Sequence, residues 1–512
     1  MKKIISTVLM TALAISMIAG CSESNSSSNS GPAKDGSDDS FEISMLYSDN
    51  ASYPYKADWK VWDIIKEHTG AEISVQAVPE SDFEAKKQIV FNSGDIPDII
   101  TKTFASEEDG LSGLLLPISQ YEDEMPNYKK FLEESGMKEE IERTRLSDGN
   151  YYTLPVNAHE TRLQDQQWLI RKDVFEKNNI PIPTTLEEMY EAGFKLKQIY
   201  PNSTPLINRF GSGNIMAAIA AGFGTAAGWS LENGEYYDAK TDSWTFGPST
   251  DNWKNMLQFT NKLFQDGVLD QEFATLDSTV YEQKIVKGNA FILYDWTGNI
   301  KRYNLQGKQN DADFNMTPIY PLKGIDGNYA ISWKSQAAQG WVFPATLKDD
   351  KDFKDILKFI DWCYTDEAEV LLTFGVKDET YKEENGVLKY VDDNVDYNAV
   401  YGLNNNSLAV RQHSDFLFSS LSKEQIDLFD KIAKDNIVPM PNPKSPLTVE
   451  NIDKSKMYSS TLTDFANTTM EKYIFGKSSI DDWDKTVKEF EAKGSEKLTE
   501  MYNDAWKNRI KQ

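Results

Sequence analysis

Strand and helix patterns alternate over residues 41–101, and this alternation limits the fold more than any other feature of the chain. The expected elements, in order, are strand Phe41–Tyr47, helix Asp58–His68, strand Ala71–Val78, a helix that begins at a Ser81–Glu84 capping box and ends at Gly94, and strand Pro97–Thr101. Strands joined through helices pair in parallel with right-handed crossovers, so this region predicts an α/β unit. Ligands of such units gather beyond the carboxyl ends of the strands, here the loops Ser48–Pro54 and Lys102–Ser106.

Several further helices and one hairpin are predicted in the rest of the chain. A capping box at Thr185 and Glu188 opens an amphipathic helix that Pro201 ends. A polar turn between aromatic flanks predicts a hairpin over Asp238–Trp244. The other predicted helices are Phe353–Tyr364, Asp366–Phe374, Lys423–Asp435 behind a Ser422–Gln425 capping box, and Ile480–Lys493.

The first 21 residues read as a lipoprotein signal, residues 1–20, followed by a lipidated cysteine. Lys2 and Lys3 precede a short apolar run, and Ile18-Ala19-Gly20-Cys21 places small residues before a thiol that could accept a diacylglyceryl group. The alternative is an ordinary secretory signal with an incidental cysteine. Residues 21–40 are rich in Ser, Asn, Gly and Asp, which predicts a flexible spacer between the anchor and the folded part.

Composition excludes several classes of partner and site. The formal charge is −26, so no basic surface is available for nucleic acid or anionic lipid. With Cys21 lipidated, Cys363 stands alone and no internal disulfide is expected. The three histidines are scattered singly, which makes a zinc site improbable, and no cofactor is predicted. Aromatic residues make up 12% of the chain, which suits a large core and also sugar stacking.

Several segments resemble the extracellular solute-binding proteins of carbohydrate ABC importers, of the long lipoprotein type (family 1). The similar segments come in the family's order: FNSGDIPD at Phe91–Asp98, DGNYYTLP at Asp148–Pro155, LIRKDVFEK at Leu169–Lys177 with IPIPTT at Ile180–Thr185, and KGNA at Lys287–Ala290 before YDW at Tyr294–Trp296. No single motif is specific, but their order and spacing together are. The resemblance extends from about Phe41 to the C-terminus.

This resemblance implies the type II two-lobe fold of periplasmic binding proteins. Each lobe would hold a mixed, mostly parallel sheet with flanking helices, and the ligand cleft would lie between the lobes. The first lobe would take residues 41–157 with a return segment at about 335–401. The second lobe would take residues 158–334 with about 402–512. Strand and helix patterns alone do not reveal this interleaving.

No catalytic or metal site is marked in the sequence. Any pair among the 80 acidic residues could be nominated as glycosidase carboxylates, and no nucleophile or triad motif is present. Asp392, Asn394, Asp396 and Asn398 have the alternate spacing of a calcium loop, but Tyr397 and Leu403 occupy the required Gly and Glu positions. Some long family members carry a calcium loop after the segment matching Lys195–Tyr200, and Tyr200–Pro205 lacks the carboxylates for it.

Sugar binding needs an exposed aromatic ring on a loop, with polar groups nearby for hydroxyls. Trp296 is the first choice because it follows a strand and precedes a Gly-containing loop, and an ordinary core tryptophan is the alternative. The other candidate ligand-binding residues are Trp229, Trp333, Tyr47, Asp49, Asn157, Arg209 and Arg411. The two arginines could meet a uronic carboxylate, although solvated surface is the simpler interpretation of each.

The sequence therefore predicts a monomeric, non-enzymatic receptor anchored by lipid on the extracytoplasmic face of the cell membrane. It would capture an oligosaccharide, with plant-polysaccharide fragments as one candidate class, and deliver it to an ABC permease. The alternatives are a surface-anchored carbohydrate-active enzyme and a peptide-binding receptor. No residue in the sequence decides between a neutral and an acidic sugar.

Overall fold

The structure is a computed structural model, which describes residues 40–508 apart from several short segments. These segments are residues 51–52, 104, 136, 147, 157–165, 210, 277, 333–336, 338, 393, 420, 438–441, 444–446 and 448. The predicted signal, Cys21 and nearly all of the spacer lie outside the described residues, as do Asn157 and Trp333.

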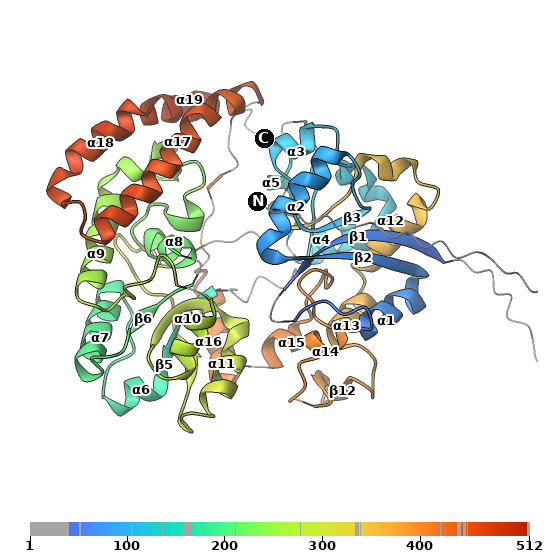
Figure 1. Ribbon diagram of the computed structural model, residues 1–512, viewed down its shortest axis with the longest axis horizontal. Helices are drawn as coiled ribbons and strands as arrows, with labels where there is room; N and C mark the ends of the chain where they lie inside the picture. Colours follow the sequence, from blue (N-terminus) through green and yellow to red (C-terminus); the bar gives the residue numbers. More distant parts are fainter. Residues whose placement is uncertain are drawn as a thin grey trace, which may run out of the picture. The chain divides into compact units, whose positions relative to one another are not determined.

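The first large sheet confirms the predicted parallel unit. Its strands are β1 (Phe41–Asp49), β2 (Ala71–Pro79), β3 (Ile99–Thr103), β4 (Leu154–Pro155) and β11 (Gly340–Val342), in the order β2-β1-β3-β11-β4. Strand β1 pairs in parallel with both β2 and β3, and β11 runs antiparallel between β3 and β4. Figure 1 shows β1, β2 and β3 beside the blue helices α1 (Lys60–Thr69) and α2 (Glu80–Ser93).

The predicted start of the second helix is wrong, although its end is right. Helix α2 begins at Glu80 directly after Pro79, without a side-chain cap, and Glu84 pairs instead with Lys87 at 2.8 Å. Strand β2 ends at Pro79, and the fixed φ of proline leads the chain into the helix before it reaches Ser81. The helix ends at Gly94, whose φ of 74° is the left-handed conformation predicted there.

The second large sheet has four strands in the order β10-β5-β9-β6. They are β5 (Gln166–Arg171), β6 (Leu206–Ile207), β9 (Ile292–Trp296) and β10 (Met316–Pro318). Strands β6 and β9 are parallel, and β5 is antiparallel to its neighbours β9 and β10. All six residues of β5 are buried, because helices pack around the sheet.

The remaining elements include most of those predicted. The hairpin, α12, α13 and the Ser422–Gln425 capping box of α16 are confirmed, and Thr185 caps α7 by accepting from the Glu188 amide. The other bounds are α3 Glu107–Leu111, α4 Pro126–Ser135, α5 Lys138–Arg143, α6 Lys172–Lys177, α7 Leu186–Ile199, α8 Gly213–Gly222, β7 Glu235–Asp238, β8 Ser243–Phe246, α9 Asp251–Gln265, α10 Ser278–Val286, α11 Ile300–Gly307, α12 Phe353–Trp362, α13 Asp366–Phe374, β12 Tyr381–Glu384, β13 Val387–Tyr390, α14 Tyr397–Tyr401, α15 Ser414–Ser419, α16 Lys423–Lys434, α17 Val449–Ile474, α18 Trp483–Ala492 and α19 Ser495–Lys507.

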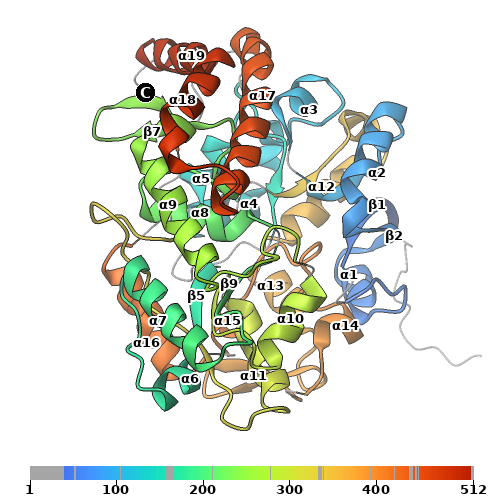
Figure 2. The same cartoon turned by 60° about the vertical axis from the view of Figure 1, so that its left-hand side comes forward.

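Each large sheet has its own main hydrophobic core. The core of the first sheet combines residues from Phe41 to Val156 with residues from Ala337 to Val410. The core of the second sheet extends from Trp168 to Tyr502, and α17 packs against α9 (Figure 2). Helix α19 packs against β8. Within the part of the chain that the structure describes, no helix has the length and apolar character needed to cross a membrane.

Candidate functional site

Two tryptophans lie side by side at one end of the second sheet, and we call Trp229 and Trp296 the aromatic platform. Trp296 is the last residue of β9, and Trp229 lies in a single 3-10 turn, Gly228–Ser230. Their ring centroids are 6.0 Å apart at an interplanar angle of 54°. Trp229 is 50% exposed, so one large aromatic surface faces solvent instead of filling the core.

Two glycines allow Trp229 to reach this position. A Cβ atom on Gly213, the first residue of α8, would overlap the indole ring of Trp229. Gly228 has a φ of 55°, and a Cβ there would overlap the Gly213 carbonyl oxygen. The turn that carries Trp229 therefore packs directly on the first turn of α8, and side chains larger than hydrogen would push it away.

Arg209 completes the platform because of the register of two parallel strands. Ile207, the last residue of β6, pairs with Leu293 in β9, and Arg209, two residues after the end of β6, lies beside Asp295. Nη2 of Arg209 donates to Oδ1 of Asp295 at 2.8 Å. The guanidinium carbon of Arg209 lies 5.1 Å from the ring centroid of Trp296, within the range of a cation–π contact.

The carboxylate of Asp295 is fully buried and collects hydrogen bonds from five groups. Besides Arg209, the donors are the Trp296 amide at 2.7 Å, Asn299 Nδ2 at 3.3 Å, the Tyr281 hydroxyl at 2.9 Å and the Tyr303 hydroxyl. A buried carboxylate is stable only when it is paired and hydrogen-bonded in this way. Asp295 thus holds in place the backbone amide of Trp296 and the guanidinium group of Arg209.

The ionisation of the surrounding groups follows from burial and from the Asp295 charge. Burial, and after it the Asp295 charge, raises the pKa of Tyr281 and of Tyr303 well above the ordinary value, so both phenols stay protonated donors. Burial alone would lower the pKa of Arg209, but the negative charge of Asp295 outweighs burial, and the pKa lies above its ordinary value.

Tyr47 and Asp49 lie at the end of β1 in the first sheet and not at the platform. The Tyr47 ring is fully buried, and its hydroxyl accepts from Asn405 Nδ2 at 2.7 Å. Asp49 accepts from the Tyr55 amide at 2.7 Å, which fixes the predicted loop after β1. Asn406 Nδ2 donates to the Tyr53 hydroxyl at 2.9 Å in the same region.

The strand order predicted ligand contacts at the loop Ser48–Pro54, but of the polar residues found there only Tyr47 and Asp49 were predicted as ligand-binding. Tyr53 lies inside the segment Ser48–Pro54 that the strand order had marked, whereas the Asn404–Asn406 run carried no strand or motif signal. These asparagines meet the loop only because the chain returns to the first sheet about 350 residues later. Their proximity is a tertiary property.

Arg411 has a structural environment in the first core. Its guanidinium donates to the Tyr364 carbonyl oxygen at 2.9 Å and pairs with Asp366 at 2.8 Å and Glu369 at 2.6 Å. It also lies 5.5 Å from the Phe131 ring. The hydrogen bond from Arg411, ahead of its charge, holds the pKa of Asp366 below its ordinary value. Arg411 therefore joins α13 to α4, and its assignment as a ligand residue stays a prediction.

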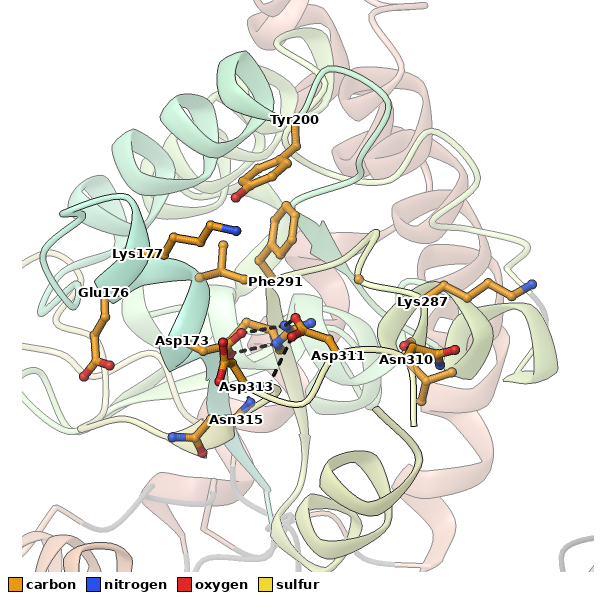
Figure 3. A pocket seen from close by; sticks show the side chains of 14 residues that line it. Asp173, Glu176, Lys177, Tyr200, Lys287, Phe291, Asn310, Asp311, Asp313 and Asn315 are labelled. Atoms are coloured by element: carbon orange, nitrogen blue, oxygen red, sulfur yellow. Dashed lines mark hydrogen bonds and ion pairs between the residues drawn. The ribbon is translucent and has the colours of Figure 1, made fainter. Parts of the chain in front are cut away.

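A separate pocket of about 780 Å³ lies at the opposite end of β5 (Figure 3). Gln166, at one end of β5, pairs with Trp296, and Arg171, at the other end, lines the pocket about 17 Å away along the strand. Arg171 donates to both carboxylate oxygens of Asp173 and to Asp311 at 3.0 Å. None of the sugar-binding candidates that the structure describes lines this pocket.

The acidic and amide residues between Asp392 and Asn398, which have the spacing of a calcium loop, form local hydrogen bonds with the backbone. Asp396 caps α14 by accepting from the Ala399 amide at 3.0 Å, and Asp392 accepts from the Asn394 amide at 2.9 Å. Over the described ranges, no group of three or more His, Cys, Asp or Glu side chains is arranged to hold a metal ion.

Residues 50–370 match the model of the bacterial extracellular solute-binding proteins, and the chain belongs to this family. It is 27% identical to lipoprotein LipO of Bacillus subtilis (strain 168) over 401 residues, which are 75% of this chain and 74% of LipO. It is 25% identical to the polygalacturonan/rhamnogalacturonan-binding protein YtcQ of the same strain over 522 residues, 99% of this chain and 98% of YtcQ.

Solved structures establish the fold. The alginate-binding protein AlgQ2, in a structure without calcium ion, matches with a TM-score of 0.73 and 18% identity over 91% of this chain and 98% of AlgQ2. The Streptococcus pneumoniae ABC-transporter substrate-binding protein FusA, in complex with kestose, matches with a TM-score of 0.70 and 18% identity over 91% of this chain and 99% of FusA. The chain thus has the two-lobe α/β fold of solute-binding proteins that the resemblance implied.

Proposed function

We propose that this protein is the substrate-binding lipoprotein of an ABC importer and that it captures an oligosaccharide for a membrane permease. The observation that carries the proposal is the aromatic platform, in which a half-exposed Trp229 adjoins Trp296 above the buried Arg209–Asp295 pair. Carbohydrate-binding relatives, including YtcQ and the FusA complex with kestose, support the same ligand class.

The apolar face of a sugar ring packs on the platform in this proposal. Tryptophan rings offer a large contact area at low entropic cost, and the sugar hydroxyls meet polar groups at the edges of the platform. Trp296 and Trp229 act from the second sheet, while Asp49 is the last residue of β1 in the first sheet. Ligand stabilises the closed arrangement of the two lobes because only that arrangement contacts it from both sides.

The division of the chain between the lobes is part of the proposal. The division expected from the resemblance puts residues 41–157 with about 335–401 in the first lobe and residues 158–334 with about 402–512 in the second, and we propose to move the last boundary to just after Val410. Strand β11, from the return segment, pairs with β3 and β4 and supports the first assignment. Leu403, Leu408 and Val410 pack in the core of the first sheet, which supports a crossover after Val410 instead of at residue 402.

A lipid anchor at Cys21 holds the protein outside the membrane in this proposal. The likeness to lipoprotein LipO and the membership of an extracellular family support this location. Acyl chains on one cysteine contribute about 0.8 kcal/mol for each buried methylene, which is enough for a durable anchor when two or three chains are present. The protein works as a monomer and catalyses no reaction.

The test is to titrate the purified full chain with an oligosaccharide panel while following both the unfolding temperature and the chromatographic profile of the sugar. We expect one related set of sugars to raise the unfolding temperature with no change in the sugar. Formation of a cleaved or modified product would replace the proposal with an enzyme. Stabilisation by peptides and not by sugars would replace it with a peptide receptor.

A further inference from the structure

Within the part of the chain that the structure describes, Arg209 at the aromatic platform and Arg302 in the same charge network are each paired with a carboxylate of the protein. We propose that the platform therefore selects uncharged sugar units and discriminates against uronic acids, an inference that rests on the proposed function and specifies its ligand class. The relative YtcQ is named for binding polygalacturonan, an acidic polysaccharide, whereas the paired charges around this platform favour an uncharged ligand.

Arg209 is committed to Asp295. Its Nη2 donates to Oδ1 at 2.8 Å, its side chain is only 12% exposed, and Asp295 is fully buried. A ligand carboxylate that took Nη2 would remove one of the five donors of Asp295 and place a second negative charge beside a buried one. Both effects disfavour an acidic ligand, because a buried charge that loses its partner is strongly destabilised.

Arg302, at the start of α11, is paired as well. Its Nη2 lies 2.7 Å from Oε1 of Glu282 and 3.2 Å from Oδ1 of Asn299, which itself donates to Asp295. Glu282 also lies 4.0 Å from Nη1 of Arg209. Two guanidinium groups and two carboxylates thus form one connected network whose formal charges sum to zero.

The platform itself repels a carboxylate. The faces of aromatic rings carry partial negative charge, so they attract the C–H face of a neutral sugar and disfavour an anion. Arg209 lies 5.1 Å from the Trp296 ring centroid, but its ion pair with Asp295 compensates its positive charge. An uncharged sugar ring can stack on the tryptophans and form hydrogen bonds at the edge of the network. It need not separate the Arg209–Asp295 or the Arg302–Glu282 ion pair.

Matched pairs of oligosaccharides test this selection. Each pair consists of a uronic oligosaccharide and its carboxyl-reduced form, which has the same linkages and no charge, and calorimetry measures affinity for the full chain at 20 and 200 mM NaCl. In every pair that binds, we expect the uncharged member to bind about tenfold more tightly, the factor that corresponds to one poorly compensated charge. We also expect its affinity to change less than about twofold between the two salt concentrations.

Two results would overturn the selection and leave the proposed function intact. These are tighter binding of the acidic member, or an affinity for the uncharged member that falls about fivefold or more with salt. Binding of none of the sugars would instead defeat the proposed function, so the two failures are distinguishable.

A pair of variants tests whether the pairing of the arginines causes the preference for uncharged sugars. Glu282→Gln removes one carboxylate from the network and leaves Arg302 undercompensated, whereas Glu500→Gln removes an exposed carboxylate on α19. We expect the preference for the uncharged member to shrink about threefold or more in Glu282→Gln and to stay unchanged in Glu500→Gln. Equal preference in the two variants would overturn the role of the paired arginines.

Discussion

Nη2 of Arg209 lies 2.8 Å from Oδ1 of Asp295, although 86 residues separate them in the chain. Parallel pairing of β6 with β9 brings the two residues together at the carboxyl ends of adjacent strands, which is where ligands of α/β proteins bind. The same carboxylate also holds the amide of Trp296. One buried ion pair thus positions the aromatic residue that we assign to the sugar.

Replacing either tryptophan of the platform should remove sugar affinity without unfolding the protein. For Trp229→Ala we expect an affinity loss of about tenfold or more, because the half-exposed ring contributes contact area to the ligand and little to the core. Trp296→Ala should abolish the ligand-induced rise in unfolding temperature. Ile89→Ala, which removes an exposed apolar side chain of α2, serves as the control for both. Unchanged sugar affinity in the tryptophan variants would show that the site is elsewhere.

Adding a methyl group at Gly213 should affect binding and not folding. Alanine is a better helix former than glycine, but a Cβ at this position overlaps the Trp229 ring and displaces it from Trp296. We therefore expect Gly213→Ala to weaken sugar binding several-fold at an unfolding temperature close to that of the parent. Calorimetric titration beside thermal unfolding measures both quantities. Parent-like affinity would mean that the position of Trp229 is irrelevant to the ligand.

Removing the Asp295 carboxylate should destabilise the protein strongly. Asp295→Ala leaves Arg209 with an uncompensated buried charge and leaves the Tyr281 and Tyr303 hydroxyls without their acceptor. We expect a loss of about 3 to 5 kcal/mol in the free energy of unfolding, measured by urea titration. Asp123→Ala removes an exposed carboxylate paired with Lys129 and should leave the urea midpoint nearly unchanged. Equal midpoints for the two variants would contradict the anchoring role of Asp295.

Glu235 should make the stability fall as the pH rises. The side chain is buried, and burial raises its pKa to about 8, while a hydrogen bond from Thr499 on α19 opposes the shift. The native state therefore keeps a proton that the unfolded chain releases near its ordinary pKa of 4.5. Stability from this group is fully present below about pH 4.5 and is lost progressively up to about pH 8, by at most about 5 kcal/mol.

Glu235→Gln isolates this effect. The variant should be more stable than the parent at pH 8 and should lack the decline attributed to Glu235, because glutamine does not ionise. Urea unfolding at several pH values between 4.5 and 8.5 provides the measurement. Glu500→Gln, which changes an exposed residue of α19, is the control and should keep the parent's pH dependence. A parent-like decline in Glu235→Gln would refute the assignment.

Loss of the predicted lipidation site should release the protein. In a host with a single membrane, we expect Cys21→Ala protein in the culture medium, with its sugar affinity intact and uptake of the sugar impaired. Immunoblots of the medium and the membrane fraction measure the distribution. Retention of Cys21→Ala at the cell surface would show that something other than the thiol anchors the chain.

The sequence predicted local elements well wherever the signal was local. The helix of residues 366–374 has the bounds predicted for it, and the Ser422–Gln425 capping box forms, because caps and helical periodicity involve neighbouring residues. The Ser81–Glu84 box failed since a competing local signal, Pro79 at the end of β2, starts the helix earlier. The parallel order of β1, β2 and β3 followed from the helices between them.

The two tryptophans of the platform could be predicted from the sequence as candidates, but their arrangement could not. Trp296 and Trp229 could each be nominated from their loop positions, but core packing was a serious alternative for both. Their proximity depends on the packing of Gly228 on Gly213, and the proximity of Arg209 to Asp295 depends on strand register. Neither relation has a signal within one stretch of chain, because both join segments that only folding brings together.

The sequence by itself determined the α/β class, the three parallel strands of the first sheet with the two helices between them, and the family through ordered motifs. Periodicity, caps and glycine turns act over a few residues and are therefore readable along the chain. Only the tertiary structure decided that Arg209 is paired with a buried carboxylate and that Arg411 joins two helices of the other core. The sequence left the charge of the sugar open for this reason: whether an arginine is available to a ligand depends on which carboxylate lies beside it in space.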